Sequence, residues 1–402
     1  MLNENIIDGM IQQIVNRQEE INIYVLQKIA KRLREIGKLS PNDVRKMQIL
    51  VTMGTDIREM NEHLSDLADL QIKDIKSLIK VVALDNYLDA KPLYDYRYKS
   101  FIPFEKNEPL QQITRAVANQ TANTYQNLSN SQATGFWVKD TKNPQQLVFK
   151  SINSSYTDAI DKAIQAVQSG VVDKETAIRD TIKQLLDSGI RRIYWNSGYT
   201  QRLDTAVRRN IQDGVKQINQ RIQDEIGKQV GADGKELSVH ANSAPDHEPF
   251  QGHQFTNEEY EKLQSHDNFR DVHGASFTGV ARIIGEWNCR HFAYSIIVGV
   301  SKPRYSAERL QEFINKNNNG YTNSQGKHLT LYECTQVQRK LETRIRYAKE
   351  EQMLMKELED RTAQQLARNK VIMLTKEYKL FSKQCGLPTK LNRAAVPGYK
   401  SW

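Results

Sequence analysis

The chain contains few cysteines and no long hydrophobic run, and these two absences exclude several classes of protein. Its 402 residues include only Cys289, Cys334 and Cys385, an odd number spread far apart, so a disulfide framework is not expected. No apolar run reaches the roughly eighteen residues that a membrane-spanning helix needs. The first residues also lack the basic flank and apolar block of a secretory signal. We therefore expect synthesis in a reducing cytoplasm.

The sequence also lacks the short motifs that mark common enzyme classes. It contains no phosphate-binding glycine loop, no dinucleotide-binding glycine fingerprint, no nucleophile elbow and no EF-hand loop. His247-Glu248 does not begin a zinc-protease helix, because Pro249 follows directly and position 251 is glutamine. No pair of carboxylates stands out as a general acid and base. The residues therefore predict neither an enzymatic activity nor a small-molecule substrate.

Positive charge is what the sequence has in excess, and it is concentrated near the C-terminus. The formal net charge is +9, and residues 331–402 supply +7 of it, with fifteen Lys and Arg against eight Asp and Glu. A basic segment of this kind favours contact with nucleic acid or with an acidic protein surface. Since the charges are interleaved, a solvated helical face is the alternative. The candidate DNA contacts are Arg339, Lys340, Arg344 and Arg346.

Apolar residues recur at helical spacing over most of the first half of the chain. Between residues 7 and 36 they form a stripe at steps of three, four and seven residues, which predicts an amphipathic helix that Gly37 ends. Ser40 and Pro41 then predict the start of another helix. We expect an N-terminal helical region at 1–104, whose helices pack against partners in this chain or in another protein.

A boundary is expected near residue 105, where prolines interrupt the helical pattern. Tyr94, Tyr96 and Tyr98 stand at alternate positions just before it, which fits either a short strand or a connector that packs on its neighbour. A second helical region, 105–233, follows. It ends in a long helix whose apolar face runs from residue 203 to residue 230 and whose outer side is basic.

Helical spacing stops near residue 234 and resumes near residue 331. Residues 234–330 contain seven of the eight histidines and β-like runs at 237–240 and 292–298, which predict a small His-rich α+β module. Residues 331–402 predict a single long basic helix, ended by Pro388, and a loose tail. The predicted fold class is a predominantly α N-terminal half with long amphipathic helices, followed by a small α+β domain and a long C-terminal helix.

Four residues of the His-rich module are candidates for a metal site, namely His240, His247, Cys289 and His291. Neutral imidazoles and a thiolate are the donors that tetrahedral zinc takes. Cys289 and His291 are two residues apart, and two such residues on an extended strand point to the same side. Their spacing matches no established zinc motif, however, and the commoner role of loop histidines is to hydrogen-bond backbone. We expect no cofactor, with zinc as the alternative.

The segments that carry these residues resemble a known family. His240…Pro245-x-His247…Gln251-Gly252 and Gly285-x-Trp287-Asn288-Cys289-Arg290-His291 are similar to the phage minor capsid protein 2 family, which belongs with the head morphogenesis proteins related to the Mu F protein. The Asn-Cys-Arg-His element is the most specific part, and the resemblance extends over nearly the whole chain. The family commonly has arginine where this chain has Ala244, which weakens an enzymatic interpretation of the first segment.

The resemblance implies a structural role in the head of a tailed bacteriophage. Such proteins are present in few copies and associate with the portal protein and other capsid proteins during head assembly, and some are thought to leave the head with the DNA. It also implies location in the virion, synthesis in the host bacterial cytoplasm, and packaged DNA as a further partner. Two alternatives stay open. One is a metal-dependent enzyme or toxin-like domain that uses the His/Cys cluster, and the other is a DNA-binding virion protein without catalysis.

Overall fold

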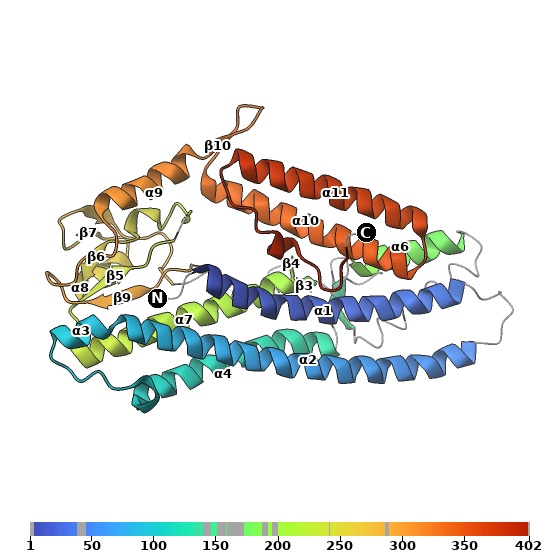
Figure 1. Cartoon of the computed structure of the whole chain (residues 1–402), viewed down its shortest axis with the longest axis horizontal. Helices are drawn as coiled ribbons and strands as arrows, with labels where there is room; N and C mark the ends of the chain where they lie inside the picture. The colour runs from blue at the N-terminus through green and yellow to red at the C-terminus, as the bar shows by residue number, and fades with distance from the viewer. Residues whose placement is uncertain are drawn as a thin grey trace.

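Four long helices run side by side along most of the length of the protein in the computed structural model (Figure 1). The four helices are α1 (Glu4–Gly37), α2 (Lys46–Asp89), α4 (Glu108–Thr134) and α7 (Leu203–Val230). The structure describes residues 4–37, 46–134, 136–139, 146–150, 158, 173–186, 192–194, 200–240, 242–285 and 289–400. The predicted helix end at Gly37 is confirmed, whereas the predicted start at Ser40 and Pro41 lies outside the described residues.

The apolar stripes read from the sequence meet in one core between these helices. The predicted long helix is confirmed as α7, which buries Leu203, Ile211, Ile222 and Val230 against α1, α2 and α4. Helix α7 ends where Gly231 takes a left-handed conformation, with φ of 66°. Burying an aliphatic side chain of this size stabilises a fold by about 1.5–3 kcal/mol, so the stripe is what holds α7 at the centre of the bundle.

The segment between α2 and α4 contains two short helices and packs on the bundle. The two are α3 (Lys91–Tyr96) and the 3-10 helix η1 (Phe104–Lys106), and no strand forms at the alternating tyrosines, so the strand alternative is wrong. Tyr94 is buried and its hydroxyl donates to Gln229 Oε1 on α7 at 2.6 Å. Tyr98 is exposed. The prediction of a connector that packs on its neighbour is therefore confirmed through Tyr94.

The region between α4 and α7 also contains elements that helical spacing did not predict. Two antiparallel hairpins pair β1 (Phe136–Lys139) with β2 (Leu147–Lys150), and β3 (Arg192–Tyr194) with β4 (Thr200–Arg202). Helix α6 (Lys174–Leu186) lies between them in sequence and packs in a second core with α1 and the C-terminal helices. Strands of three or four residues are too short to show a period in the sequence.

A small α+β region lies at one end of the bundle (left in Figure 1). Its three-stranded antiparallel sheet has the order β6-β5-β9, and a separate hairpin pairs β7 with β8. The predicted strand at 237–240 occurs earlier, at 234–237, and the one predicted at 292–298 occurs at 293–296. The elements are β5 (Gly234–Leu237), η2 (Glu248–Phe250), β6 (Gln254–Thr256), α8 (Asn257–Leu263), β7 (Asn268–Arg270), β8 (Ser276–Thr278), β9 (Ala293–Ile296) and α9 (Ala307–Asn319).

The chain ends in a helical hairpin that lies along α1. The long C-terminal helix is confirmed as α10 (Leu331–Glu357), which follows the short hairpin of β10 (Tyr321–Thr322) and β11 (His328–Leu329). The expectation of a single helix is wrong, because the chain turns at 358–360 and returns as α11 (Arg361–Gln384). The turn places Glu359 at φ of 61° and uses the Asp360 carboxylate as the N-cap of α11.

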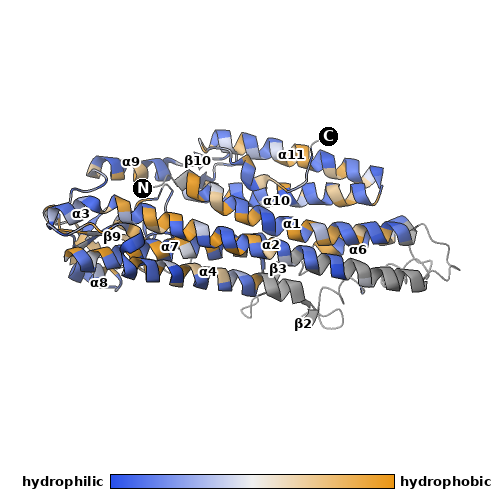
Figure 2. Ribbon diagram, turned by 60° about the horizontal axis from the view of Figure 1, so that its bottom comes forward, coloured by the Kyte–Doolittle hydropathy of each residue, from blue (hydrophilic) through white to orange (hydrophobic). Residues whose placement is uncertain are grey.

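The last residues are not a loose tail, which corrects the prediction for them. They form the 3-10 helix η3 (Leu391–Ala394), bury Ala394 and Val396, and bring Arg393 onto α1. Hydrophobic and polar residues alternate around the long helices (Figure 2), as expected for helices that each bury one face. Among the described residues, none of the helices has an apolar stretch of the length needed to span a bilayer.

Candidate functional site

The pairing of β5 with β9 brings together two segments that are about sixty residues apart in sequence. Leu237, the last residue of β5, lies opposite Ala293, the first residue of β9. Because the strands are antiparallel, the residues that follow β5 and those that precede β9 lie at the same end of the sheet. Reciprocal bonds between Ser238 and Phe292 extend the ladder there, from Ser238 N to Phe292 O at 2.9 Å and from Phe292 N to Ser238 Oγ at 3.1 Å.

Three of the four candidate metal ligands lie together at this end of the sheet. Cys289 Sγ lies 3.3 Å from His247 Nδ1 and 3.4 Å from His291 Nδ1. His247 is 1% exposed, and Cys289 and His291 are each 4% exposed. The fourth candidate, His240, lies beside them, with its ring centroid 4.7 Å from that of His291. The structure therefore gathers two imidazoles and one thiol in a buried cluster, hereafter the His/Cys cluster, with a third imidazole adjacent.

Helix α7 fixes the position of the sheet that carries this cluster. Gln223 on α7 accepts from Ser295 N at 2.8 Å through its side chain and from Ser295 Oγ at 2.6 Å through its carbonyl. Gln220 accepts from Ala293 N at 2.9 Å. These bonds satisfy the edge of β9 that has no neighbouring strand, so the start of β9 is held against a rigid helix.

Hydrogen bonds around His247 fix its tautomer. Its Nε2 lies 2.7 Å from the carbonyl oxygen of Arg282. Since a carbonyl only accepts, Nε2 carries the proton, and in the neutral ring the lone pair of Nδ1 then points toward Cys289. Arg282 is itself held by two bonds to Asp246, at 2.8 and 3.1 Å. The ring of His247 is thus oriented by groups that do not belong to the cluster.

Burial and mutual contact shift the pKa values of the cluster in different directions. Burial lowers the pKa of His247, but hydrogen bonds to Cys289 and to the Arg282 carbonyl outweigh it and leave this pKa raised. Burial raises the pKa of the Cys289 thiol, but its hydrogen bonds with His247 and with backbone groups leave this pKa lowered. Burial, together with the charges of His240 and His247, lowers the pKa of His291 to about 2. The imidazole ring of His291 is therefore uncharged at pH 7.

Sequence reasoning missed the residues that support the cluster. Arg282 and Asp246 are 36 positions apart. Gln251 stands in the family-like segment, but nothing in the sequence indicated that its side chain accepts from His240 N, at 3.0 Å. No spacing rule connects these residues with the histidines. His253, a histidine near the cluster in sequence, instead forms a pair with Asp271 at 2.7 Å.

The four candidate DNA contacts have two different environments. Arg339, Lys340 and Arg344 are exposed on α10, and Arg344 lies 3.8 Å from Glu377 on α11. Arg346 is buried and contacts Glu19 at 3.3 Å and Asp204 at 2.8 Å. Assignment of Arg346 as a DNA contact is therefore corrected, because its charge is already compensated inside the protein.

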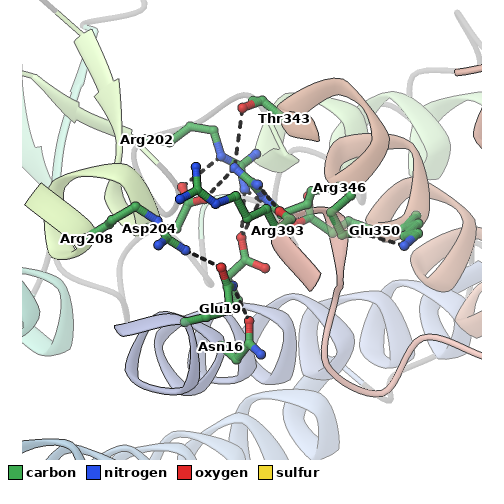
Figure 3. A network of polar contacts seen from close by, with 12 residues as sticks. Asn16, Glu19, Arg202, Asp204, Arg208, Thr343, Arg346, Glu350 and Arg393 are labelled. Atoms are coloured by element: carbon green, nitrogen blue, oxygen red, sulfur yellow. Dashed lines mark hydrogen bonds and ion pairs between the residues drawn. The ribbon is translucent and has the colours of Figure 1, made fainter. Parts of the chain in front are cut away.

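Arg346 belongs to a buried ion-pair network that joins three helices, shown in Figure 3. Arg202, at the start of α7, contacts Asp204 at 2.9 Å, Glu19 of α1 at 3.2 Å and Glu350 of α10 at 3.5 Å. The carboxylates of Glu19 and Asp204 thus each contact two arginines. The network fastens the C-terminal hairpin to the long-helix bundle.

A second group of charges extends this network to the end of the chain. Asp8 on α1 contacts Arg393 at 2.7 Å, Arg208 at 3.4 Å and Lys390 at 3.5 Å. Burial raises the pKa of Asp8, but the nearby cations, above all Arg393, outweigh it and lower this pKa below its usual value. Burial also lowers the pKa of Arg208 to about 10, and the charge of Arg393 adds to the effect.

One comparison with known proteins identified a family. A family model described as "Phage minor capsid protein 2" matches residues 2–381, which is nearly the whole chain. Comparisons with curated proteins and with solved structures gave no match. The matched range includes the His/Cys cluster, the four-helix bundle and all but the last residues of α11.

Proposed function

Because the chain belongs to the phage minor capsid protein 2 family and is therefore a structural protein of a bacteriophage head, we propose that it docks on the portal vertex through α11 and acts there in head assembly. The family places it in the virion and among other head proteins. Nothing about this role requires catalysis.

The observation that carries this proposal is an apolar stripe on the outer face of α11. Leu366, Met373 and Leu380 are 66%, 59% and 54% exposed and lie seven residues apart, so they share one face of the helix. The opposite face, with Val371 and Tyr378, is buried against α10. Exposed apolar residues that recur in this way mark a helix that packs against another protein.

The proposal is tested by removing the stripe without changing the buried face. A triple variant, Leu366→Gln, Met373→Gln and Leu380→Gln, is expected to fold normally but to bind purified portal rings at least tenfold more weakly. Phage heads assembled with it should contain correspondingly less of the protein. A matched control replaces the neighbouring exposed residues Asn369, Lys376 and Lys383 by Gln, and it should behave as the wild type. Wild-type portal binding by the stripe variant would contradict the proposal.

We also propose that the chain contacts packaged DNA through α10, in addition to docking. Arg339 and Lys340 are adjacent and exposed, and neither forms an ion pair with any carboxylate among the described residues. Each phosphate contact contributes about −0.9 to the slope of log K against log salt concentration. The double variant Arg339→Ala and Lys340→Ala should therefore make that slope shallower by about 2. An unchanged slope would remove these residues from the DNA interface.

A further inference from the structure

We infer that the His/Cys cluster is a zinc site, with His247, Cys289 and His291 as ligands and His240 as the fourth. The cluster contains three ligand atoms that lie within 4.8 Å of one another, one from each of His247, Cys289 and His291. They come from two segments that are held in place by the β5–β9 pairing and by the 3-10 helix that follows His247. The inference does not depend on the proposed docking function.

The distances in the cluster fit a tetrahedral zinc ion. Zinc binds thiolate at about 2.3 Å and imidazole nitrogen at about 2.0–2.1 Å, which places the two donors about 3.6 Å apart at the tetrahedral angle. The observed distances from Sγ to the two Nδ1 atoms are 3.3 and 3.4 Å. Only a small outward movement of the side chains is needed to admit the ion.

The hydrogen bonds of His247 are those of a metal ligand. Its Nε2 proton is bound by the Arg282 carbonyl, which leaves Nδ1 free to bind a cation. Arg282 is held in turn by Asp246, so the ring has a fixed orientation before any metal binds. An outer partner that fixes the tautomer accompanies most histidine ligands of zinc.

Burial of His291 supports the same assignment. This imidazole is 4% exposed, and among the described residues its Nε2 atom has no hydrogen-bond partner. Its Nδ1 atom meets only the weakly hydrogen-bonding sulfur of Cys289. A buried polar ring is seldom left with so few partners, and a bound cation at Nδ1 supplies the missing interaction.

His240 is the side chain best placed to complete the coordination. Two imidazoles on one tetrahedral zinc have ring centroids about 5 Å apart, as follows from the bond lengths above. The centroids of His240 and His291 are 4.7 Å apart, and those of His247 and His291 are 5.6 Å apart. One thiolate and three imidazoles favour zinc over magnesium or calcium, which prefer oxygen donors. Four protein ligands leave no open position, so the ion joins the segment after β5 to the segment before β9 and does not act on a substrate.

The test is a metal measurement on the purified full-length chain. Protein stripped with a chelator is titrated with Zn²⁺ alone, and it should bind zinc in equimolar amount. The Co²⁺-substituted protein should show a thiolate-to-metal charge-transfer band. Cys289→Ser should lose that band and most of the zinc, whereas Cys334→Ser and Cys385→Ser, which alter buried cysteines elsewhere, should retain both.

Zinc binding by the stripped wild-type protein is the first requirement, and it is measured whether or not any variant folds. Absence of zinc binding by the stripped wild-type protein would overturn the inference, as would undiminished binding by folded Cys289→Ser. His240→Ala should weaken zinc affinity at least tenfold. Unchanged affinity in that variant would overturn the four-ligand assignment.

Discussion

Replacement of Arg346 by methionine is expected to destabilise the protein strongly. Methionine retains most of the apolar stem of arginine, so the change removes the charge with little loss of packing. Arg346 is 10% exposed at its side chain and contacts Glu19 and Asp204, whose side chains are almost fully buried. Its guanidinium also donates to the carbonyl of Arg393. The substitution leaves both carboxylates with one arginine, Arg202, in place of two.

The expected loss follows from the cost of leaving a buried charge without its partner. Removing one member of a buried ion pair typically costs about 3–5 kcal/mol. Since Arg202 still contacts Glu19 and Asp204, at 3.2 and 2.9 Å, the lower end of that range applies, or about 3 kcal/mol. The loss should appear as earlier separation of the C-terminal hairpin from the bundle, because the network joins these two parts.

Urea unfolding of the full-length chain, followed by circular dichroism, measures this loss. The matched control is Arg344→Met, two residues earlier on the same helix. Arg344 is 59% exposed at its side chain and lies 3.8 Å from the half-exposed Glu377, so its loss should cost no more than about 0.5 kcal/mol. The reasoning is refuted if the two variants unfold at the same urea concentration, or if Arg346→Met is as stable as the wild type.

Two further predictions concern acid stability and helix packing. The folded-state pKa of Asp8 is lowered, so its contribution to stability is present above the unfolded-state pKa of about 3.9 and is lost as pH falls through the lower folded value. Asp8→Asn should therefore lower Tm at pH 7 but hardly at pH 2, and an equal decrease at both pH values would refute the assignment. At Gly214 of α7 an added Cβ would collide with both branches of Thr121 on α4, so Gly214→Ala should destabilise by about 1–3 kcal/mol. Gly9→Ala on α1, where a Cβ meets nothing within 4 Å, should instead stabilise by up to about 1 kcal/mol, and thermal unfolding of both variants checks the opposite signs.

The long helices were predictable because many apolar residues in each recur at the same helical spacing. Helix α7 begins at Leu203 and ends before Gly231, as its stripe and the following turn predicted. The break between α10 and α11 was not predictable. It contains neither glycine nor proline, and it depends on Glu359 adopting a left-handed conformation that composition does not indicate.

In the candidate site, too, contacts between residues close in sequence were predictable and contacts between distant residues were not. The two-residue spacing of Cys289 and His291 predicted that they point to one side, and the structure places Sγ and Nδ1 3.4 Å apart. The contact between Arg282 and Asp246 depends on how the loops fold over the sheet, which no local pattern records. The burial of Arg346 could not be predicted from the sequence either. The helical pattern around a charged residue does not distinguish an arginine in contact with water from one that pairs with a distant glutamate.

The contact between Asp8 and Arg393 has a consequence for the order of events during translation. The two residues are 385 positions apart in the chain. A ribosome adding about 5–20 residues per second needs roughly 20–80 s between them, so the start of α1 is without this partner for at least that time. A prematurely terminated polypeptide that lacks Arg393 cannot form this contact, and nascent copies therefore differ from finished ones at the surface where the hairpin meets α1.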